Sequence, residues 1–420
     1  MKLRSVMAML LAVVMLLACA SVGVAAEAKT KVTIWHTFTK DQEAYLVKAA
    51  ADFNALSDKY EVEVLSQAYS GFTDTVKTAV KNGVGPDIIF NYASEAAEYV
   101  DLGLVADLSQ YIYSDENGIE GFDTSLAQGV MDGEVNGFSD GLIHYLPAYT
   151  TGPILYYNAT LYTELGLTVP TTWDEVVENC KVIKDKKNIP GLGFDSLTDC
   201  IQMFIMEDGC GYIDTENKCV TFNTESMKAK IQWLVDCVNA GYFTIASSGD
   251  YFSTDFNSGI VASYIGSCAG YPYIAPDGFE FAMAPMPATT WYPSWNRGPI
   301  VFYYNDDARA EGAYEFVKYF ISADVNLGWV KAVNALAPYS WTKELEGYKE
   351  YLAEDTLAIK SLNAVSAHLD IAGSLPSVTG ASTVRKEIVN AVKNVINNGK
   401  TVEEAWNECE ILCNAALKGE

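Results

Sequence analysis

The chain has 420 residues, and its 54 acidic side chains against 28 basic ones give a formal net charge of −26. This surplus of negative charge disfavours nucleic acid and anionic lipid headgroups as partners and keeps a protein in solution. Half of the residues are hydrophobic and 12% are aromatic, which excludes a disordered chain, and the length suits two lobes of roughly 200 residues each.

The first residues are typical of an export signal. Lys2 and Arg4 precede an apolar run of 13 residues, 6–18, which is too short to span a bilayer and has the size of a signal-peptide core. Two processing sites compete. Small residues before Glu27 suit ordinary signal peptidase and a signal peptide over 1–26, whereas "LLAC", ending at Cys19, resembles a lipobox, with a signal over 1–18 and a lipidated cysteine.

No later segment reaches the roughly 18 uninterrupted apolar residues of a membrane span. The sequence therefore predicts an exported protein, periplasmic or at the cell surface. Its only attachment to the membrane would be a lipid on Cys19.

Strands and helices alternate through the first part of the mature chain. We expect strands at 31–37, 60–68 and 87–91 and helices at 41–56, 72–81 and 95–102. Such β-α-β order predicts an α/β fold with a largely parallel sheet covered by helices on both faces, and with ligands at the carboxyl ends of the strands.

A second α/β unit and a helical C-terminal part follow. Helices are expected near 173–186 and 225–240, with strands at "GLGF", "GIVASYIG" and "FEFAMAP". The chain is expected to cross between the units near residues 149, 290 and 338. Lobe 1 would hold 27–149 and 290–338, and lobe 2 would hold 150–289 and 339–420. Thr401 and Glu404 form a predicted capping box, after Gly399 has ended the preceding helix.

Eight cysteines remain after Cys19, and export permits disulfides. Cys210 and Cys219 flank a hairpin-like turn and are the favoured pair, although the connectivity cannot be read from sequence. Cys409 and Cys413 lie four residues apart on one helix face, a spacing that would also hold a metal. Because further ligands are missing nearby, we predict neither a metal site nor a cofactor.

Five segments in this order carry a family resemblance: "VTIWHTF", "NGVGPDIIF", "LPAYTTGPILYYN", "PTTWDEV" and "AYEFVKYFISADVNLGWVKAVNALAP". They resemble extracellular solute-binding proteins of ABC importers, in the family that holds the maltodextrin and glycerol-3-phosphate binders. The resemblance implies a type II periplasmic-binding-protein-like fold, with two lobes joined by a three-crossing hinge. It also implies a monomer without catalytic activity, which closes on one ligand and docks on the transmembrane subunits of a permease.

Rings and polar side chains on the expected rim of the cleft favour a carbohydrate, because aromatic faces stack on the C–H faces of sugar rings while polar groups take the hydroxyls. The candidate binding residues at strand ends and crossings are His36, Phe72, Tyr92, Ser94, Glu95, Thr150, Thr151, Asp195, Ser267, Trp291, Trp295, Asn296, Arg297 and Tyr339.

A second ligand class remains an alternative, because the amino-acid sequences of several segments are similar to those of the glycerol-3-phosphate binder. The positions that match its pocket are Thr150 or Thr151, Ser267, Gly298 and Arg385, whereas three polar partners of that binder are replaced, one of them by Phe72. Their loss would leave a phosphate ester underbound, so a sugar is favoured over glycerol-3-phosphate or a glycerophosphodiester.

A remote alternative is a secreted glycosidase. Such an enzyme needs two carboxyl groups about 5 to 10 Å apart across the scissile bond. Glu95 and Asp195, on opposite lobes, would meet only on closure.

Overall fold

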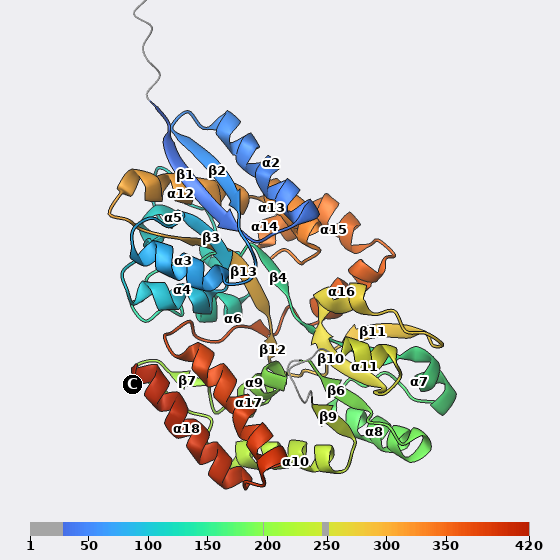
Figure 1. The fold of residues 1–420 in the computed structure, drawn as a ribbon. Coiled ribbons are helices and arrows are strands. Elements are labelled where there is room, and N and C mark those ends of the chain that lie inside the picture. The colour runs from blue at the N-terminus through green and yellow to red at the C-terminus, as the bar shows by residue number, and fades with distance from the viewer. Residues whose placement is uncertain (1–27, 196, 246–251, 420) are drawn as a thin grey trace, which may run out of the picture.

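Two five-stranded sheets, one at the centre of each lobe, organise the chain (Figure 1). The structure is a computed structural model that describes residues 28–195, 197–245 and 252–419. The predicted signal peptide and the candidate lipidation site, Cys19, lie outside the described residues.

The sheet of the first lobe has the order β2-β1-β3-β13-β4. Its strands are β1 (Thr30–His36), β2 (Tyr60–Ser66), β3 (Ile88–Asn91), β4 (Tyr149–Thr151) and β13 (Trp295–Val301). β1 runs parallel to β2 and β3, whereas β13 runs antiparallel to β3 and β4. The sheet is therefore mixed, because the strand that returns from the second lobe enters it in the opposite direction.

Helices cover both faces of this sheet. They are α2 (Lys40–Leu56), α3 (Phe72–Lys81), α4 (Ala93–Val100), α12 (Asp307–Phe320) and α13 (Ala323–Val333), with the short α5 (Ser109–Ile112), α6 (Gln128–Val130), α14 (Ser340–Lys343) and α15 (Glu346–Leu352) beside them. Successive side chains of a strand point to opposite faces. Ile88 and Phe90 of β3 accordingly join the core under α2 and α12, while Ile89 joins the core under α3 and α4.

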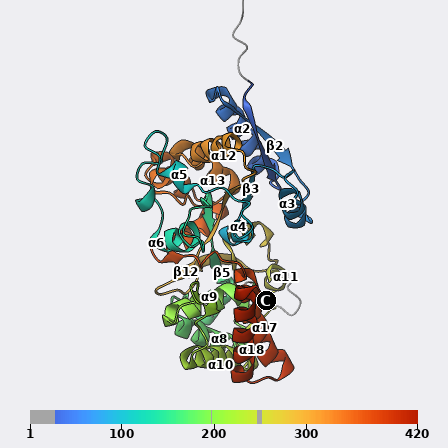
Figure 2. The same ribbon diagram turned by 90° about the vertical axis from the view of Figure 1, so that its left-hand side faces the viewer.

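The sheet of the second lobe has the order β11-β5-β10-β6-β9 and is mixed as well. Its strands are β5 (Pro153–Asn158), β6 (Leu192–Phe194), β9 (Phe243–Ile245), β10 (Ser263–Ser267) and β11 (Phe281–Pro285). The helices of this lobe are α7 (Ala159–Leu165), α8 (Trp173–Lys187), α9 (Leu197–Asp208), α10 (Glu225–Asn239), α11 (Ser253–Asn257), α16 (Leu357–Ser366), α17 (Ala381–Asn398) and α18 (Val402–Lys418). Figure 2 shows α17 and α18 side by side in the second lobe, with α10 at the end of the molecule away from the first lobe.

Smaller elements complete the chain. They are the 3-10 turns η1 (Phe122–Thr124) and η3 (Cys268–Tyr273), the π-helix η2 (Met131–Val135), the hairpin β7 (Ile213–Asp214) and β8 (Cys219–Val220), and the pair β12 (Tyr292–Pro293) and β14 (Ala372–Gly373).

Three chain segments run side by side where the lobes meet. Thr150 and Leu336 exchange backbone hydrogen bonds of 2.8 and 2.9 Å, and Thr151 pairs with Trp295 in the register of β4 and β13. Gly152 permits this packing, since a Cβ there would lie 2.2 Å from the Tyr292 hydroxyl. The two lobes and their three crossings are as the sequence predicts, and the boundary residues between the lobes stay predictions.

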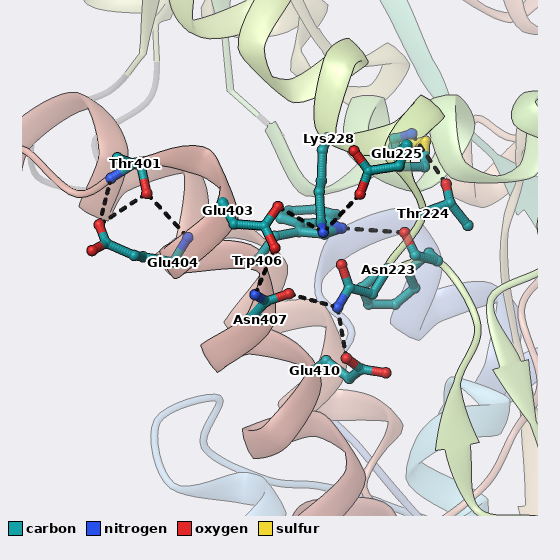
Figure 3. A network of polar contacts seen from close by, with 12 residues as sticks. Asn223, Thr224, Glu225, Lys228, Thr401, Glu403, Glu404, Trp406, Asn407 and Glu410 are labelled. Atoms are coloured by element: carbon teal, nitrogen blue, oxygen red, sulfur yellow. Dashed lines mark hydrogen bonds and ion pairs between the residues drawn. The ribbon is translucent and has the colours of Figure 1, made fainter.

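The C-terminal helix α18 is fixed to the second lobe by polar contacts (Figure 3). Lys228 of α10 binds Glu225 at 3.2 Å and Glu403 at 2.7 Å. Asn223 donates to Asn407 and to Glu410 at 2.9 and 2.6 Å. Glu403, in the first turn of α18, thus holds this helix to α10.

The predicted capping box of α18 is present. The Thr401 hydroxyl accepts the Glu404 N–H at 3.2 Å, and the Glu404 carboxylate accepts the Thr401 N–H at 3.0 Å (Figure 3). Loss of an N-cap hydroxyl costs about 1 kcal/mol. We therefore expect Thr401→Ala to lower the free energy of unfolding by about 1 kcal/mol in urea titrations, with Thr401→Ser as the control that keeps it. Equal stability of Thr401→Ala and the wild type would contradict this role.

All eight cysteines from Cys180 onward are free thiols. The predicted disulfide between Cys210 and Cys219 is wrong, because the hairpin register places Cys219 opposite Asp214, while Cys210 precedes the hairpin. The Cys409 and Cys413 sulfurs are buried and lie 3.7 Å apart.

Among the described residues, no group of three or more His, Cys, Asp or Glu is arranged to hold a metal, and no helix has the length and apolar character of a membrane span.

Candidate functional site

A cavity of about 430 Å³ lies between the lobes, against the hinge. Its lining comes from the start of α4, from η2, from β12 and β13, from α9, from α17 and from the segment that joins β14 to α17. The lining residues are Tyr92, Ala93, Ser94, Glu134, Asp199, Gln202, Tyr212, Trp291, Pro293, Ser294, Trp295, Asn296, Gly373, Ser374, Leu375, Pro376, Ser377, Ala381 and Arg385.

Two indole rings form the hinge side of the cavity. Trp291 and Trp295 flank β12 and are both half-buried. Gly373 of β14 lets the Trp291 ring come close, since a Cβ there would lie 2.2 Å from its Nε1. Trp295 donates its Nε1–H to Asp199 at 3.1 Å. That hydrogen bond constrains the orientation of the Trp295 ring at the wall of the cavity.

The second lobe contributes a charged cluster. Asp199 lies in the first turn of α9, and Arg385 extends from α17 with its guanidinium 3.4 Å from the Asp199 carboxylate. Arg385 also donates to the side-chain oxygen of Gln202 at 3.0 Å, and Gln202 donates to the Tyr212 hydroxyl at 2.9 Å. The side chain of Arg385 is still 44% exposed, so this cluster presents donors and acceptors to the cavity with its opposite charges paired.

The start of α4 forms the first-lobe wall. Tyr92, the residue before α4, is 47% exposed, and Ala93 and Ser94 begin the helix. Burial raises the pKa of the Tyr92 phenol, and the positive charges of Arg297 and Arg385 partly oppose this shift. The phenol is therefore neutral at physiological pH and able to donate a hydrogen bond.

Among the described residues of the lining, Glu134 is the one carboxyl group from the first lobe. It lies in η2 and is 7% exposed. Burial raises its pKa to about 8, against hydrogen bonds from Ser374 and Asn296 that lower it. Its Oε1 accepts the Asn296 amide at 3.3 Å. At pH 7 the group is mainly a neutral carboxylic acid.

Asn296 is the centre of the buried polar network behind the cavity. Its side-chain oxygen accepts the Thr150 hydroxyl at 2.6 Å. Its amide nitrogen lies 3.1 Å from the Ser294 hydroxyl and 3.2 Å from the Ser374 hydroxyl. The network therefore joins the first crossing, the second crossing and the segment that leads to α17.

The cavity brings together six of the residues singled out in the sequence. They are Tyr92, Ser94, Trp291, Trp295, Asn296 and Arg385. Four others belong to the hinge itself. Thr150 and Thr151 bind Asn296 and the Trp295 carbonyl, Arg297 donates to the Phe90 carbonyl at 3.0 and 3.2 Å, and Gly298 lies where a Cβ would be 2.0 Å from the Leu146 carbonyl oxygen.

The structure places the remaining candidates outside the lining. Phe72 packs in the core under α3 and α4, and Tyr339 is 0% exposed and stacks on Trp341. Both positions are apolar packing sites, which corrects the expectation of ligand-facing rings. His36 is buried at the end of β1, where its Nδ1 accepts the Phe38 N–H at 3.1 Å and where burial lowers its pKa.

Three further candidates have structural partners of their own. Glu95 accepts the Tyr99 hydroxyl at 3.5 Å, Asp195 accepts the Phe252 N–H, and Ser267 caps η3 by accepting the Ala269 N–H at 3.2 Å. Burial raises the pKa of both Glu95 and Asp195. None of the three is among the residues that line the cavity.

Sequence reasoning missed the residues that complete the cavity. These are Glu134, Asp199, Gln202, Tyr212, Ser294 and the segment 373–377. Two of them could have been found from the sequence. Asp199 lies at the start of a helix, directly after the end of a predicted strand. The segment "GSLPS" at 373–377 has the small polar composition of a functional loop. Glu134 could not have been found in this way, since it lies in a long connection without a regular hydrophobic periodicity.

Comparison with known proteins agrees with this architecture. The family of bacterial extracellular solute-binding proteins matches residues 48–347. The multiple sugar-binding protein of Streptococcus mutans serotype c (strain ATCC 700610 / UA159) is 28% identical over 181 residues, which are 42% of this chain and 40% of that relative. The sn-glycerol-3-phosphate-binding periplasmic protein UgpB of Rhizobium meliloti (strain 1021) is 23% identical over 360 residues, 79% of this chain and 81% of that protein.

Solved structures show the same fold. The cyclic alpha-maltosyl-1,6-maltose binding protein from Arthrobacter globiformis superposes with a TM-score of 0.80 at 21% identity, over 94% of this chain and 100% of the other. The sugar-binding protein MalE from Xanthomonas citri gives a TM-score of 0.77 at 18% identity, over 93% and 98%. With the family matched over residues 48–347, the chain belongs to the bacterial extracellular solute-binding proteins.

Proposed function

We propose that this protein is the substrate-binding component of an ABC uptake system, which captures a sugar or an oligosaccharide between its lobes and delivers it to a membrane permease. The observation that carries the proposal is the charge of the cavity. Arg385 is the only cationic side chain among the described residues of the lining, and it lies 3.4 Å from Asp199. With Glu134 neutral, the cavity has no surplus charge and suits an uncharged ligand with many hydroxyl groups.

The two tryptophans support the same ligand class. Trp291 and Trp295 present indole rings beside the Asp199, Gln202 and Arg385 cluster. A sugar ring has apolar C–H faces and a polar edge, so it would stack on an indole while its hydroxyls bind the cluster. The maltose-type and sugar-binding relatives at low identity are consistent with this assignment.

Glycerol-3-phosphate is the second candidate, because UgpB proteins match over most of this chain. A phosphate dianion in a closed cavity needs cations that are free to neutralise it. The guanidinium of Arg385 would have to leave Asp199 or share its charge, which makes the phosphate ester the weaker ligand. A secreted glycosidase receives no support, since the family consists of binding proteins and neither Glu95 nor Asp195 lines the cavity.

A thermal-shift screen tests the ligand class. A ligand at 100 times its dissociation constant stabilises the folded protein by about 2.7 kcal/mol. We expect a rise of the melting temperature with at least one sugar or oligosaccharide and no rise with glycerol-3-phosphate or a glycerophosphodiester. Stabilisation by the phosphate compounds alone would overturn the carbohydrate assignment in favour of the second candidate.

Trp295→Ala should weaken carbohydrate binding by at least about 1 kcal/mol, because the stacking surface and the hydrogen bond to Asp199 are both lost. Isothermal titration calorimetry with the sugar that gives the largest thermal shift measures the effect. Tyr273→Ala is the matched control, since that ring is exposed and outside the cavity. Unchanged affinity of Trp295→Ala would remove this ring from the binding site.

A further inference from the structure

We propose that Glu134 is a specificity-determining residue of the cleft, which meets the solute as a neutral carboxylic acid and donates one hydrogen bond to an oxygen atom of the ligand. The inference rests on the proposed function, since it concerns the same cavity, and it adds a donor of unusual chemistry to that site. It assigns a role to a residue that neither the sequence pattern nor the hinge explains.

The first argument is an unmet hydrogen-bonding group. Glu134 lines the cavity with 93% of its surface buried, and its Oε2 has no hydrogen-bond partner among the described residues. Its other oxygen accepts the Asn296 amide at 3.3 Å, and the Ser374 hydroxyl is a second donor to the carboxyl group. A buried polar atom without a partner costs stability, so a protein keeps one where a ligand or a water completes it.

The second argument is the backbone that carries the residue. Glu134 lies in η2, a π-helix over Met131–Val135. Turns of this kind are rare and occur frequently at functional sites. Gly133, directly before Glu134, lies where a Cβ would be 2.2 Å from the Ser374 carbonyl oxygen. The missing side chain lets η2 press against the segment 373–377, and this contact brings Glu134 to the junction of first lobe, hinge and second lobe.

The third argument is the protonation state. Burial raises the pKa of Glu134 to about 8. The groups that face it are Tyr145 and Tyr339 from the first lobe, both with a pKa raised by burial, and, around the same cavity, Tyr92, Asp199 and Arg385. The two phenols stay neutral through pH 9, and no salt-bridge partner of Glu134 is found among the described residues. With Oε1 accepting the Asn296 amide, we place the proton of the acid on Oε2. This atom is buried in the ligand-free protein, so a ligand reaches it only where the cavity wall moves.

A donor at this place selects among solutes. A ligand oxygen that accepts a hydrogen bond, such as a sugar hydroxyl or ring oxygen, satisfies the acid. A ligand that offers only donors there leaves the acid unpaired, and an anion would meet repulsion as soon as the acid ionised. Binding should therefore require the neutral form.

Affinity measured against pH tests the inference. The neutral fraction of an acid with a pKa of about 8 falls about tenfold from pH 7 to pH 9, and the apparent affinity should fall by the same factor. The probes are the sugar with the largest thermal shift and glycerol-3-phosphate, titrated into the wild type, Glu134→Gln, Glu134→Ala and Asp132→Asn. Asp132 is an exposed carboxylate on the same π-helix and serves as the matched control.

We expect Glu134→Gln, which keeps a neutral donor, to bind within about threefold of the wild type at pH 7 and to lose the pH dependence. Glu134→Ala should bind at least about tenfold more weakly, and Asp132→Asn should behave as the wild type. If any probe binds and Glu134→Ala binds it equally well, or if the wild type shows no pH dependence, the inference is wrong while the binding function stands. Binding of glycerol-3-phosphate alone, still dependent on Glu134, would overturn the carbohydrate assignment and keep the inference. A wild type that binds neither probe would overturn both.

Discussion

Glu134→Gln is expected to make the ligand-free protein more stable, by an amount that grows between about pH 4.5 and pH 8. The pKa of Glu134 is raised from 4.5 to about 8 by burial, so the folded state holds a proton that the unfolded chain releases in this range. The contribution of Glu134 to the stability of the wild type is therefore complete below about pH 4.5 and is lost progressively as the pH rises to about 8. At about 1.4 kcal/mol per pKa unit, the loss approaches 5 kcal/mol.

Urea titrations of both proteins at several pH values measure this effect. The difference in the free energy of unfolding between Glu134→Gln and the wild type should rise through the stated range and level off above about pH 8. Asp132→Asn, on the exposed side of the same element, should show no such slope. A constant difference at all pH values would mean that Glu134 ionises as an ordinary carboxyl group.

Gly133→Ala is expected to oppose closure of the two lobes. A Cβ at this position would lie 2.2 Å from the Ser374 carbonyl oxygen and 2.7 Å from its carbon. These atoms are backbone and cannot move aside as a flexible side chain would, and they belong to the segment that leads from the hinge into α17. The lobes can relieve the overlap by opening. Overpacking of this kind costs about 1 to 3 kcal/mol, so carbohydrate affinity should fall by roughly 5- to 150-fold.

Calorimetry and small-angle X-ray scattering distinguish opening from unfolding. We expect Gly133→Ala to keep its helical circular dichroism, to bind more weakly and to show a larger radius of gyration with ligand than the wild type. Gly270→Ala is the control, since a Cβ there meets only the Tyr156 hydroxyl at 3.6 Å. A Gly133→Ala protein that binds as tightly as the wild type would show that η2 and the segment 373–377 need not touch in the bound state.

Much of the fold could be predicted from the sequence, because local signals and global architecture agree. The helix predicted at 72–81 is α3, the predicted capping box at Thr401 forms, and Gly399 ends α17 in a left-handed conformation. Such elements are set by neighbours within a few residues. The predicted Cys210–Cys219 pair was wrong because the hairpin is shorter than its turn suggests: Cys219 pairs with Asp214, and Cys210 lies before the first strand.

The binding residues were harder to predict, because the cleft is formed by segments far apart in the sequence. Trp295 was expected in the site from its place at a crossing, but its partner Asp199 is 96 residues away and on another element. Phe72 and Tyr339 look like ligand-stacking rings in the sequence and are packing residues in the structure. Burial decides between these roles, and burial is a property of the assembled lobes.

A crystal structure of the wild type with the sugar that stabilises it most in the thermal-shift screen is the most direct test of a clamp for uncharged sugars. The ligand should occupy the cavity between the lobes, with a ring on Trp291 or Trp295 and hydroxyls bound to the Asp199, Gln202 and Arg385 cluster. A sugar bound on the outer surface, with the cavity closed by the protein's own side chains, would contradict it.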